Sequence, residues 1–225
     1  MIIEIAGIDG AGKSTQIARL ARVAQECKVP CYERSLRSTG RRILSGIAAQ
    51  QGLEWRALFD RGAVELATAL EMFQLFHATV VPIQFSGQMI VTDTYVREWL
   101  AVAIAEGGEN VSQIVEIYRA MPSPDLSVQL DCSVDTAFCR IVARPKGDHL
   151  LRSGGKARLQ RLADAYATGL DELVGYETAH VSGEAEEAAT FAAILQLILA
   201  WAAEGDSTLY SRLSSAAIAL TGQRA

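Results

Sequence analysis

Hydrophobic and polar positions follow two alternating patterns along the chain, one typical of buried strands and one typical of amphipathic helices. Short runs of apolar, often β-branched residues predict strands at 2–6, 29–33, 88–92, 125–130 and 177–182. Apolar residues that recur every three or four positions predict helices at 13–27, 40–51, 55–80, 97–120, 133–143, 156–173, 184–203 and 207–220. Such alternation predicts an α/β fold with a five-stranded parallel sheet between layers of helices.

The first predicted strand leads directly into a glycine-rich loop. "GIDGAGKST", residues 7–15, fits the pattern G-x-x-x-x-G-K-[ST], and a helical pattern follows it. Glycines let main-chain N–H groups surround a phosphate, and the helix N-terminus adds partial positive charge. Lys13 would reach the β- and γ-phosphates of a nucleoside triphosphate, and the Ser14 hydroxyl would ligate Mg²⁺. A glycine turn with a chance lysine is the alternative. The predicted nucleotide-binding residues of the loop are Gly7, Gly10, Ala11, Gly12, Lys13, Ser14 and Thr15.

An acidic residue ends another apolar run. Asp93 follows "QMIVT" in the stretch "VTDTY", residues 91–95. Ligands of parallel sheets bind beyond the carboxyl ends of the strands, so Asp93 and the glycine loop should lie at the same edge. Asp93 would hold Mg²⁺ opposite Ser14, directly or through water. Aspartate is also a favoured first residue of a helix, so a capping role is the alternative, and the two roles are compatible.

Charge narrows the class of ligand. The formal net charge of −5 at pH 7 argues against a general nucleic-acid surface, so an anionic ligand would need local positive charge. Most of the 21 cationic residues are arginines, which suit bidentate phosphate contacts. A coding bias of the genome towards arginine is the alternative explanation.

Cysteine spacing and hydropathy exclude two further classes. Four cysteines form no C-x₂-C pair, and there are only three histidines, so we expect no zinc site. The sequence shows no secretory leader, which favours reduced thiols in a cytoplasmic protein. The uncharged stretch 188–203 is short for a membrane span, so we expect a buried helix and no membrane partner.

Several segments resemble one known family. "GIDGAGKST" resembles the phosphate loop of thymidylate kinases and related nucleoside monophosphate kinases, and "VTDTY" resembles their strand-end D-R-[YH]. "PDLSVQLDCSVDTAFCRIVAR", residues 124–144, is similar to their PDL-strand-LD segment, and "LQRLADAYATGL" resembles the helix after their lid. The similarity spans roughly 1–205 in order and spacing, and it is poorest over 30–85.

The resemblance implies a fold and a reaction. The fold is a P-loop NTPase three-layer sandwich at 1–205 with a basic lid at about 144–158, followed by a helical extension at 206–225. The reaction is Mg²⁺-dependent transfer of the γ-phosphoryl group of ATP to a nucleoside monophosphate, as in dTMP to dTDP. The resemblance also implies a small-molecule acceptor and a homodimer. Its implied catalytic residues are Lys13, Asp9, Asp93, Arg144 and Arg152, with Arg140 beside the ATP.

Two of these roles have simpler alternatives. Basic residues and glycines coincide after residue 144, which predicts a closing flap whose arginine stabilises transition-state charge. A solvated surface loop is the alternative. By resemblance, Asp9 lies near the acceptor sugar and the water shell of the metal, whereas an aspartate that only shapes the turn is the alternative.

The acceptor half departs from the family pattern. Where the family has a phosphate-gripping arginine after the strand-end aspartate, this chain has Thr94. Losing that contact would weaken phosphate binding by about 1.5–3 kcal/mol unless Arg37 or Arg97 replaced it. Arg34, Arg41 and Arg42 lie nearby in the sequence. The residues expected for base recognition are absent, because their places fall near Thr68 and Met72. The predicted acceptor-binding residues are Asp9, Arg37, Met72, Thr94, Tyr95 and Arg97.

Two other functions stay open from the sequence. One is a P-loop kinase that acts on a non-nucleotide metabolite, which would explain the changed acceptor positions. The other is a catalytically degenerate ATP-binding regulatory module. No N-K-x-D base-reading motif of a GTPase switch occurs in the chain.

Overall fold

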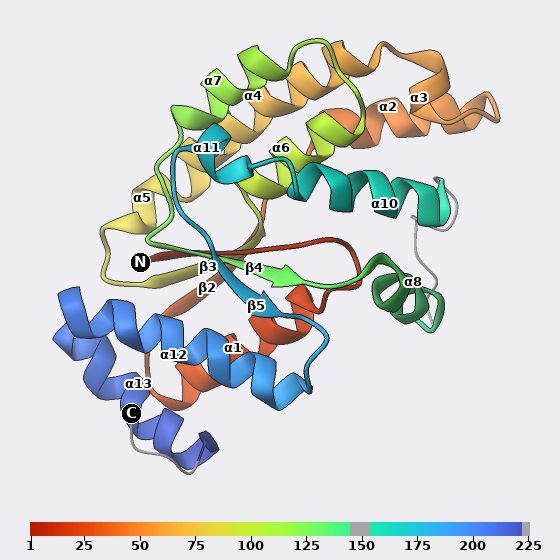
Figure 1. Ribbon diagram of the computed structural model, residues 1–225. Helices are drawn as coiled ribbons and strands as arrows, with labels where there is room; N and C mark the ends of the chain where they lie inside the picture. Colours follow the sequence, from red (N-terminus) through yellow and green to blue (C-terminus); the bar gives the residue numbers. More distant parts are fainter. Residues whose placement is uncertain (145–153, 222–225) are drawn as a thin grey trace.

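The sheet has the predicted class of architecture. A computed structural model describes residues 1–144 and 154–221, with side chains described as far as residue 214. Within these residues, five strands form one parallel sheet in the order β2-β3-β1-β4-β5 (Figure 1). The strands are β1 Ile2–Ala6, β2 Cys31–Ser35, β3 Met89–Thr94, β4 Leu126–Asp131 and β5 Ala179–Ser182. The predicted α/β sandwich with a five-stranded parallel sheet is therefore confirmed.

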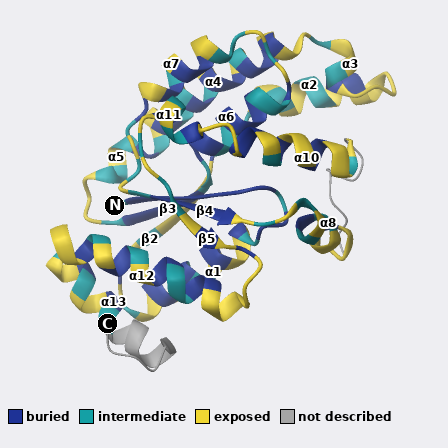
Figure 2. Ribbon diagram, in the orientation of Figure 1, coloured by how far each residue is buried: buried dark blue, intermediate teal, exposed yellow. Residues whose placement is uncertain are grey.

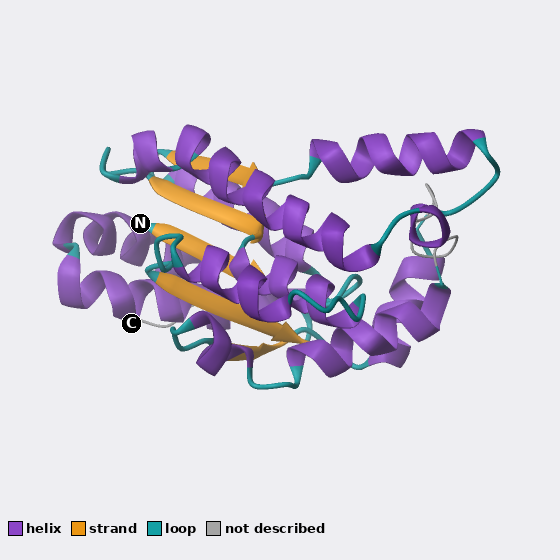
Figure 3. Ribbon diagram, turned by 90° about the horizontal axis from the view of Figure 1, so that it is seen from above, coloured by secondary structure: helices purple, strands orange, loops and turns teal. Residues whose placement is uncertain are grey.

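Helices cover both faces of the sheet (Figures 1 and 3). One face carries α1 Lys13–Glu26, α12 Glu187–Gly205 and α13 Ser207–Thr221. The other face carries α4 Arg61–Thr79, α6 Val96–Ala105, α7 Val111–Arg119, α10 Gly155–Tyr166 and α11 Leu170–Val174. Four further helices complete the described chain: α2 Thr39–Gln50, α3 Trp55–Leu58, α5 Val81–Gln84 and α8 Val134–Val142. The division into a domain at 1–205 and an extension at 206–225 stays a prediction.

The central strands form the middle of the core. Ile3 and Ile5 of β1, Val91 of β3 and Val128 of β4 are fully buried. Figure 2 draws much of the central sheet in the colour of buried residues. Strands that are covered on both faces consist of nearly continuous apolar residues, and for this reason the hydrophobic pattern of the sequence predicted their positions. The edge strand β2 is largely exposed.

Three predicted helices are interrupted in the structure, and each break has a local cause. The helix expected at 55–80 is divided into α3 and α4, and Asp60 caps α4 by accepting a 2.7 Å hydrogen bond from the Ala63 N–H. The helix expected at 97–120 is interrupted between α6 and α7, where Gly107 adopts φ 71°. The helix expected at 156–173 ends at α10, and Gly169 at φ 72° precedes α11. Left-handed glycines of this kind end helices.

The most apolar helix packs on the core. By length and composition, α12 is the one described helix that could cross a membrane, a test that core helices of globular proteins also pass. In the structure, Phe191, Ile194 and Ile198 on one face of α12 are buried in the main hydrophobic cluster. This agrees with the expected buried helix at 188–203.

Phe191→Ala tests whether α12 is part of the core. Phe191 is 1% exposed and Phe85 is 87% exposed, so Phe85→Ala is the matched control. We expect Phe191→Ala to lower the free energy of unfolding by about 3–5 kcal/mol, because it removes a buried ring and leaves a cavity. Phe85→Ala should change it by less than about 0.5 kcal/mol. Urea unfolding followed by circular dichroism measures both, and equal effects would contradict the packing.

Candidate functional site

The phosphate loop joins β1 to α1 and requires glycine at several positions. Gly7, Gly10 and Gly12 adopt φ values of 137°, 90° and 105°, a region that favours glycine. A Cβ on Gly10 would lie 2.4 Å from the carbonyl oxygen of Ala137 in α8. The loop therefore has a fixed shape pressed against α8, and the N-terminus of α1 follows it directly.

Lys13 lies at the base of this loop as a buried cation. Its Nζ donates a hydrogen bond to the Gly7 carbonyl and forms a 3.3 Å ion pair with Glu98 Oε2. Burial lowers the pKa of Lys13, but the carboxylates of Glu98, Asp9 and Asp93 more than offset this and hold the pKa above its ordinary value. The ammonium is therefore held in its charged form, and Lys13 lines the cavity described below.

Sequence reasoning missed Glu98. It lies in the first turn of α6, on the next element after Asp93, and its Oε2 also accepts a 2.8 Å hydrogen bond from the Tyr166 hydroxyl of α10. Burial raises the pKa of the Glu98 carboxyl. The positive charge of Lys13 acts to lower this pKa, and the negative charge of Asp9 acts to raise it further. No motif marks this glutamate, and only the fold shows that it faces Lys13.

A cavity of about 420 Å³ brings together residues predicted for the donor and for the acceptor. It is lined by the phosphate loop and by the ends of β2 and β3 with parts of α2, α6 and α10. Of the residues predicted for the site, the lining includes Asp9, Gly10, Gly12, Lys13, Ser14, Thr15, Arg37, Asp93, Thr94 and Arg144.

The cavity fits a magnesium ion held partly by substrate. The Ser14 hydroxyl and the Asp93 carboxylate both line it, and these are oxygen ligands of the kind Mg²⁺ prefers. Among the residues that the structure describes, no group of three or more His, Cys, Asp or Glu side chains could hold a metal alone. One or two protein oxygens combined with phosphate oxygens and water is the usual arrangement for Mg²⁺.

Arg37 is the arginine that the structure brings to Thr94. The last pairing of β2 with β3 sets Ser35 opposite Thr94, and their hydroxyl oxygens are 3.1 Å apart. Arg37 Nε donates a 3.2 Å hydrogen bond to the same Ser35 hydroxyl. The guanidinium of Arg37 therefore lies beside the position where the family arginine is missing.

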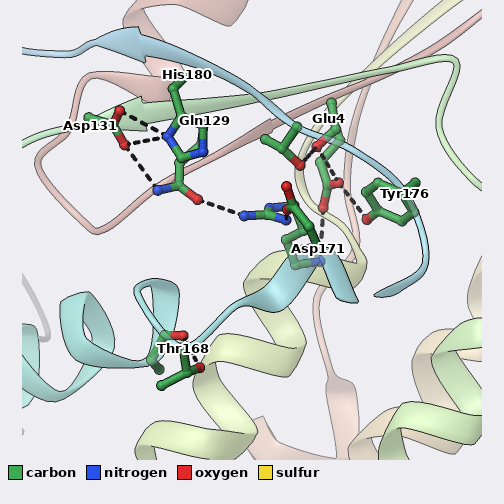
Figure 4. A network of polar contacts seen from close by, with 11 residues as sticks. Glu4, Gln129, Asp131, Thr168, Asp171, Tyr176 and His180 are labelled. Atoms are coloured by element: carbon green, nitrogen blue, oxygen red, sulfur yellow. Dashed lines mark hydrogen bonds and ion pairs between the residues drawn. The ribbon is translucent and has the colours of Figure 1, made fainter. Parts of the chain in front are cut away.

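Arg97 is not in this cavity, which corrects one of the two candidates for that role. Its side chain is 2% exposed and its guanidinium donates to Asp171 and, over 2.7 Å, to Gln129 Oε1. Its main-chain N–H donates to Glu4 Oε1 at 2.9 Å, inside the polar network of Figure 4. Because a buried charge requires partners, Arg97 stabilises the fold and is not available to an acceptor phosphate.

Two further predicted acceptor residues also lie elsewhere. Tyr95 is buried and its hydroxyl donates a 2.6 Å hydrogen bond to the Pro122 carbonyl. Met72 is fully buried in the main cluster, and neither residue lines the cavity. The helical spacing of α4 sets Met72 on its buried face, so apolar packing overrides the family position.

Arg140, which the resemblance sets beside the ATP, contacts the phosphate loop. Its Nη1 donates to the carbonyl oxygens of Gly10 at 3.3 Å and Gly183 at 2.7 Å, which ties the phosphate loop to the turn after β5. Of the expected lid residues, Arg144 lines the cavity and Arg152 lies outside the described residues. Arg158 of α10 lines it too, with its Nε 3.4 Å from Glu106.

The acceptor side has an aromatic wall that the sequence did not reveal. Trp99 and Arg41 line the cavity, and the Arg41 guanidinium carbon lies 5.0 Å from the centre of the Trp99 ring. Arg41 also pairs with the buried carboxylate of Glu65. A ring and a held guanidinium form a surface on which a planar group can stack.

Comparisons with known proteins show what the whole chain is similar to. No protein-family model matches the chain. It is 29% identical over 151 residues to the probable thymidylate kinase of Thermococcus onnurineus, covering 64% of this chain and 72% of the relative. It is 29% identical over 168 residues to the probable thymidylate kinase of Pyrobaculum calidifontis, covering 75% of this chain and 81% of that relative. The thymidylate kinase of Desulfotalea psychrophila is 29% identical over 153 residues, covering 63% and 68%. The chain is thymidylate kinase-like. At these identities the family likeness is distant, and it suggests a kinase phosphotransferase without fixing the acceptor.

Gly10→Ala tests the fixed shape of the phosphate loop. We expect a loss of about 1–3 kcal/mol of unfolding free energy, because the new Cβ meets the Ala137 carbonyl at a positive φ. Gly46→Ala is the control, since Gly46 is helical and nothing lies within 4 Å of its added Cβ. That control should gain about 0.5–1 kcal/mol. Thermal unfolding of both variants measures this, and a stable Gly10→Ala variant would contradict the close approach.

Proposed function

We propose that the chain transfers the γ-phosphoryl group of ATP to a nucleoside monophosphate, in the manner of a thymidylate kinase that converts dTMP to dTDP, with an altered choice of acceptor. The observation that carries this proposal is one cavity in which Lys13, Ser14 and Asp93 face Arg37 and Thr94. The likeness to thymidylate kinases supports it independently.

The donor side has the parts that phosphoryl transfer needs. The reaction depends on positioning and on neutralising negative charge, and little covalent chemistry is required of the protein. Main-chain N–H groups of the loop and the Lys13 ammonium bind the phosphates of ATP in this proposal. Ser14 and Asp93 would hold Mg²⁺, which neutralises charge on the β- and γ-phosphates. Arg140 borders the nucleotide side, and Arg144 faces the cavity.

The acceptor side has a replacement cation and a new wall. Arg37 supplies the positive charge that Thr94 lacks, and Asp9 lies at the boundary between donor and acceptor. Because Met72 is in the core, a base or similar planar group would instead meet Trp99 and Arg41. Because Trp99 and Arg41 would take the place of Met72 beside the base, we propose an acceptor different from that of thymidylate kinases. Arg152 in the lid, a cytoplasmic location and a homodimeric state stay predictions.

Incubation with Mg-ATP and a panel of nucleoside monophosphates tests the proposed function. ADP release that depends on a monophosphate is the expected result, and the preferred base identifies the acceptor. Tight binding of ATP without release of ADP for any monophosphate would contradict the proposal, and would favour a kinase for another metabolite or a regulatory ATP-binding module.

Lys13→Ala should reduce phosphoryl transfer by at least about 100- to 1,000-fold, because it removes the cation that meets the developing charge. Circular dichroism and thermal unfolding should show that the fold persists, since the sheet and the glycines of the loop are unchanged. Steady-state ADP release measures the transfer rate. Preserved activity in the folded variant would contradict the donor assignment.

Arg37→Ala should raise the KM for the acceptor far more than the KM for ATP. The charge-assisted contact that it removes is worth about 1.5–3 kcal/mol, which corresponds to roughly a 10- to 150-fold change. Arg22→Ala is the matched control, because Arg22 is an exposed arginine of α1 outside this cavity. Initial rates at varied acceptor and varied ATP separate the two constants, and an unchanged acceptor KM removes Arg37 from the site.

A further inference from the structure

We propose that the same cavity also phosphorylates a hydroxyl, the 5′-hydroxyl of a nucleoside, with the Glu98 carboxylate as the proton acceptor. This inference rests on the proposed donor function, because both reactions use ATP bound at the same loop. It adds a second class of acceptor and assigns a chemical role to a residue that the phosphate-acceptor reaction does not use.

Glu98 lies where such a proton acceptor is needed. Its Oε2 is 3.3 Å from Lys13 Nζ, and Lys13 is the cation assigned to the β- and γ-phosphates. An acceptor atom that attacks the γ-phosphorus must approach the same ammonium from the open side of the cavity, which Glu98 also lines. A general base must lie within hydrogen-bond reach of the proton that it takes, and Glu98 would meet this requirement for an acceptor bound in the cavity beside Lys13.

The position of Glu98 is fixed by a second partner. Its Oε2 accepts the Tyr166 hydroxyl hydrogen at 2.8 Å, so α10 holds the carboxylate that α6 presents. A carboxylate held between a lysine and a tyrosine hydroxyl cannot turn away to solvent without losing both contacts. This arrangement resembles the way in which a base is oriented by a neighbouring group.

The charges around Lys13 favour an uncharged acceptor. Asp9, Asp93 and Glu98 all act electrostatically on the one ammonium of Lys13. An acceptor phosphate adds a further charge of about −1.5 to −2 beside these groups, and like charges at short range repel. Mg²⁺ at Asp93 and the guanidinium of Arg37 offset part of that repulsion, but Glu98 remains. For a hydroxyl acceptor the repulsion is absent, and Glu98 gains a proton to accept.

The transfer step balances without another reactant. The hydroxyl oxygen forms a bond to the γ-phosphorus, and the bond from that phosphorus to the β–γ bridging oxygen breaks. ADP leaves with the electron pair of the broken bond. The hydroxyl proton passes to a Glu98 oxygen and from there to solvent, which restores the carboxylate for the next turnover.

Two substitutions in opposite halves of the acceptor site give the sharpest test. The enzyme is incubated with Mg-ATP and either the common deoxynucleosides or their 5′-monophosphates, and the phosphorylated product is identified by mass. E98Q keeps the size of the side chain but cannot take a proton, so the nucleoside rate should fall at least about 100-fold relative to the monophosphate rate. R37A should move the ratio in the other direction, because only the monophosphate presents a phosphate to Arg37.

Controls separate a chemical role from a structural one. E204Q changes an exposed glutamate at the end of α12, away from the cavity, and should leave the ratio at its wild-type value. E98D retains the carboxylate and should recover part of the nucleoside rate, which also covers the case in which E98Q does not fold. Binding of a fluorescent ATP analogue to each variant shows whether the phosphate loop is intact.

The outcomes divide the two proposals. Transfer to monophosphates but to none of the nucleosides overturns this inference and leaves the proposed function intact. Equal losses for both acceptors in E98Q also overturn it, since Glu98 would then only position Lys13. No transfer to either acceptor, despite ATP binding, overturns the proposed function and this inference together. Nucleoside transfer with the opposed shifts in E98Q and R37A supports it.

Discussion

The structure of the site depends on keeping the Lys13 ammonium charged while it is buried. An isolated buried ammonium is strongly unfavourable and would lose its proton. Here the Gly7 carbonyl and three carboxylates compensate, from Glu98, Asp9 and Asp93. These groups come from the glycine loop, the end of β3 and the start of α6. They meet only because β1 and β3 are adjacent parallel strands, paired at Ile3 and Val91.

A buried acidic residue, Glu4, contacts the start of α6. Glu4 of β1 is 1% exposed, and burial raises the pKa of its carboxyl. Hydrogen bonds from Tyr176, the Arg97 N–H and Ser127 act in the opposite direction and lower this pKa. The bond from Arg97 holds the first turn of α6 against the sheet. The arginine side chain then leaves on one side towards Asp171, while the next residue, Glu98, faces Lys13 on the other. The first turn of α6 therefore contributes one residue, Arg97, to the network in Figure 4 and the next residue, Glu98, to the phosphate site.

The sequence predicted those parts of the site that local chemistry determines. The glycine loop, Asp93 and the ends of the strands follow from a motif and from apolar runs, and the structure brings Asp93 to the loop as expected. Arg97 could not be assigned in this way, because its position depends on Glu4, which is distant in sequence but adjacent in the sheet. Arg37 depends on the pairing of Ser35 with Thr94. The helix breaks at Asp60, Gly107 and Gly169 were also missed, since the apolar period continues across them.

The two halves of the cavity therefore depend on different features of the chain. The shape of the phosphate loop depends on glycines with positive φ and on the pairing of central strands, so substitutions of these glycines disturb the loop. The acceptor half is built from side chains of α2, α6 and α10, such as Arg41, Trp99 and Arg158, which can change while the sheet stays the same. The distant likeness to thymidylate kinases suggests a kinase without identifying its acceptor. Glu98, Arg37 and Trp99 line this cavity together, so a change of acceptor would be expressed in these side chains.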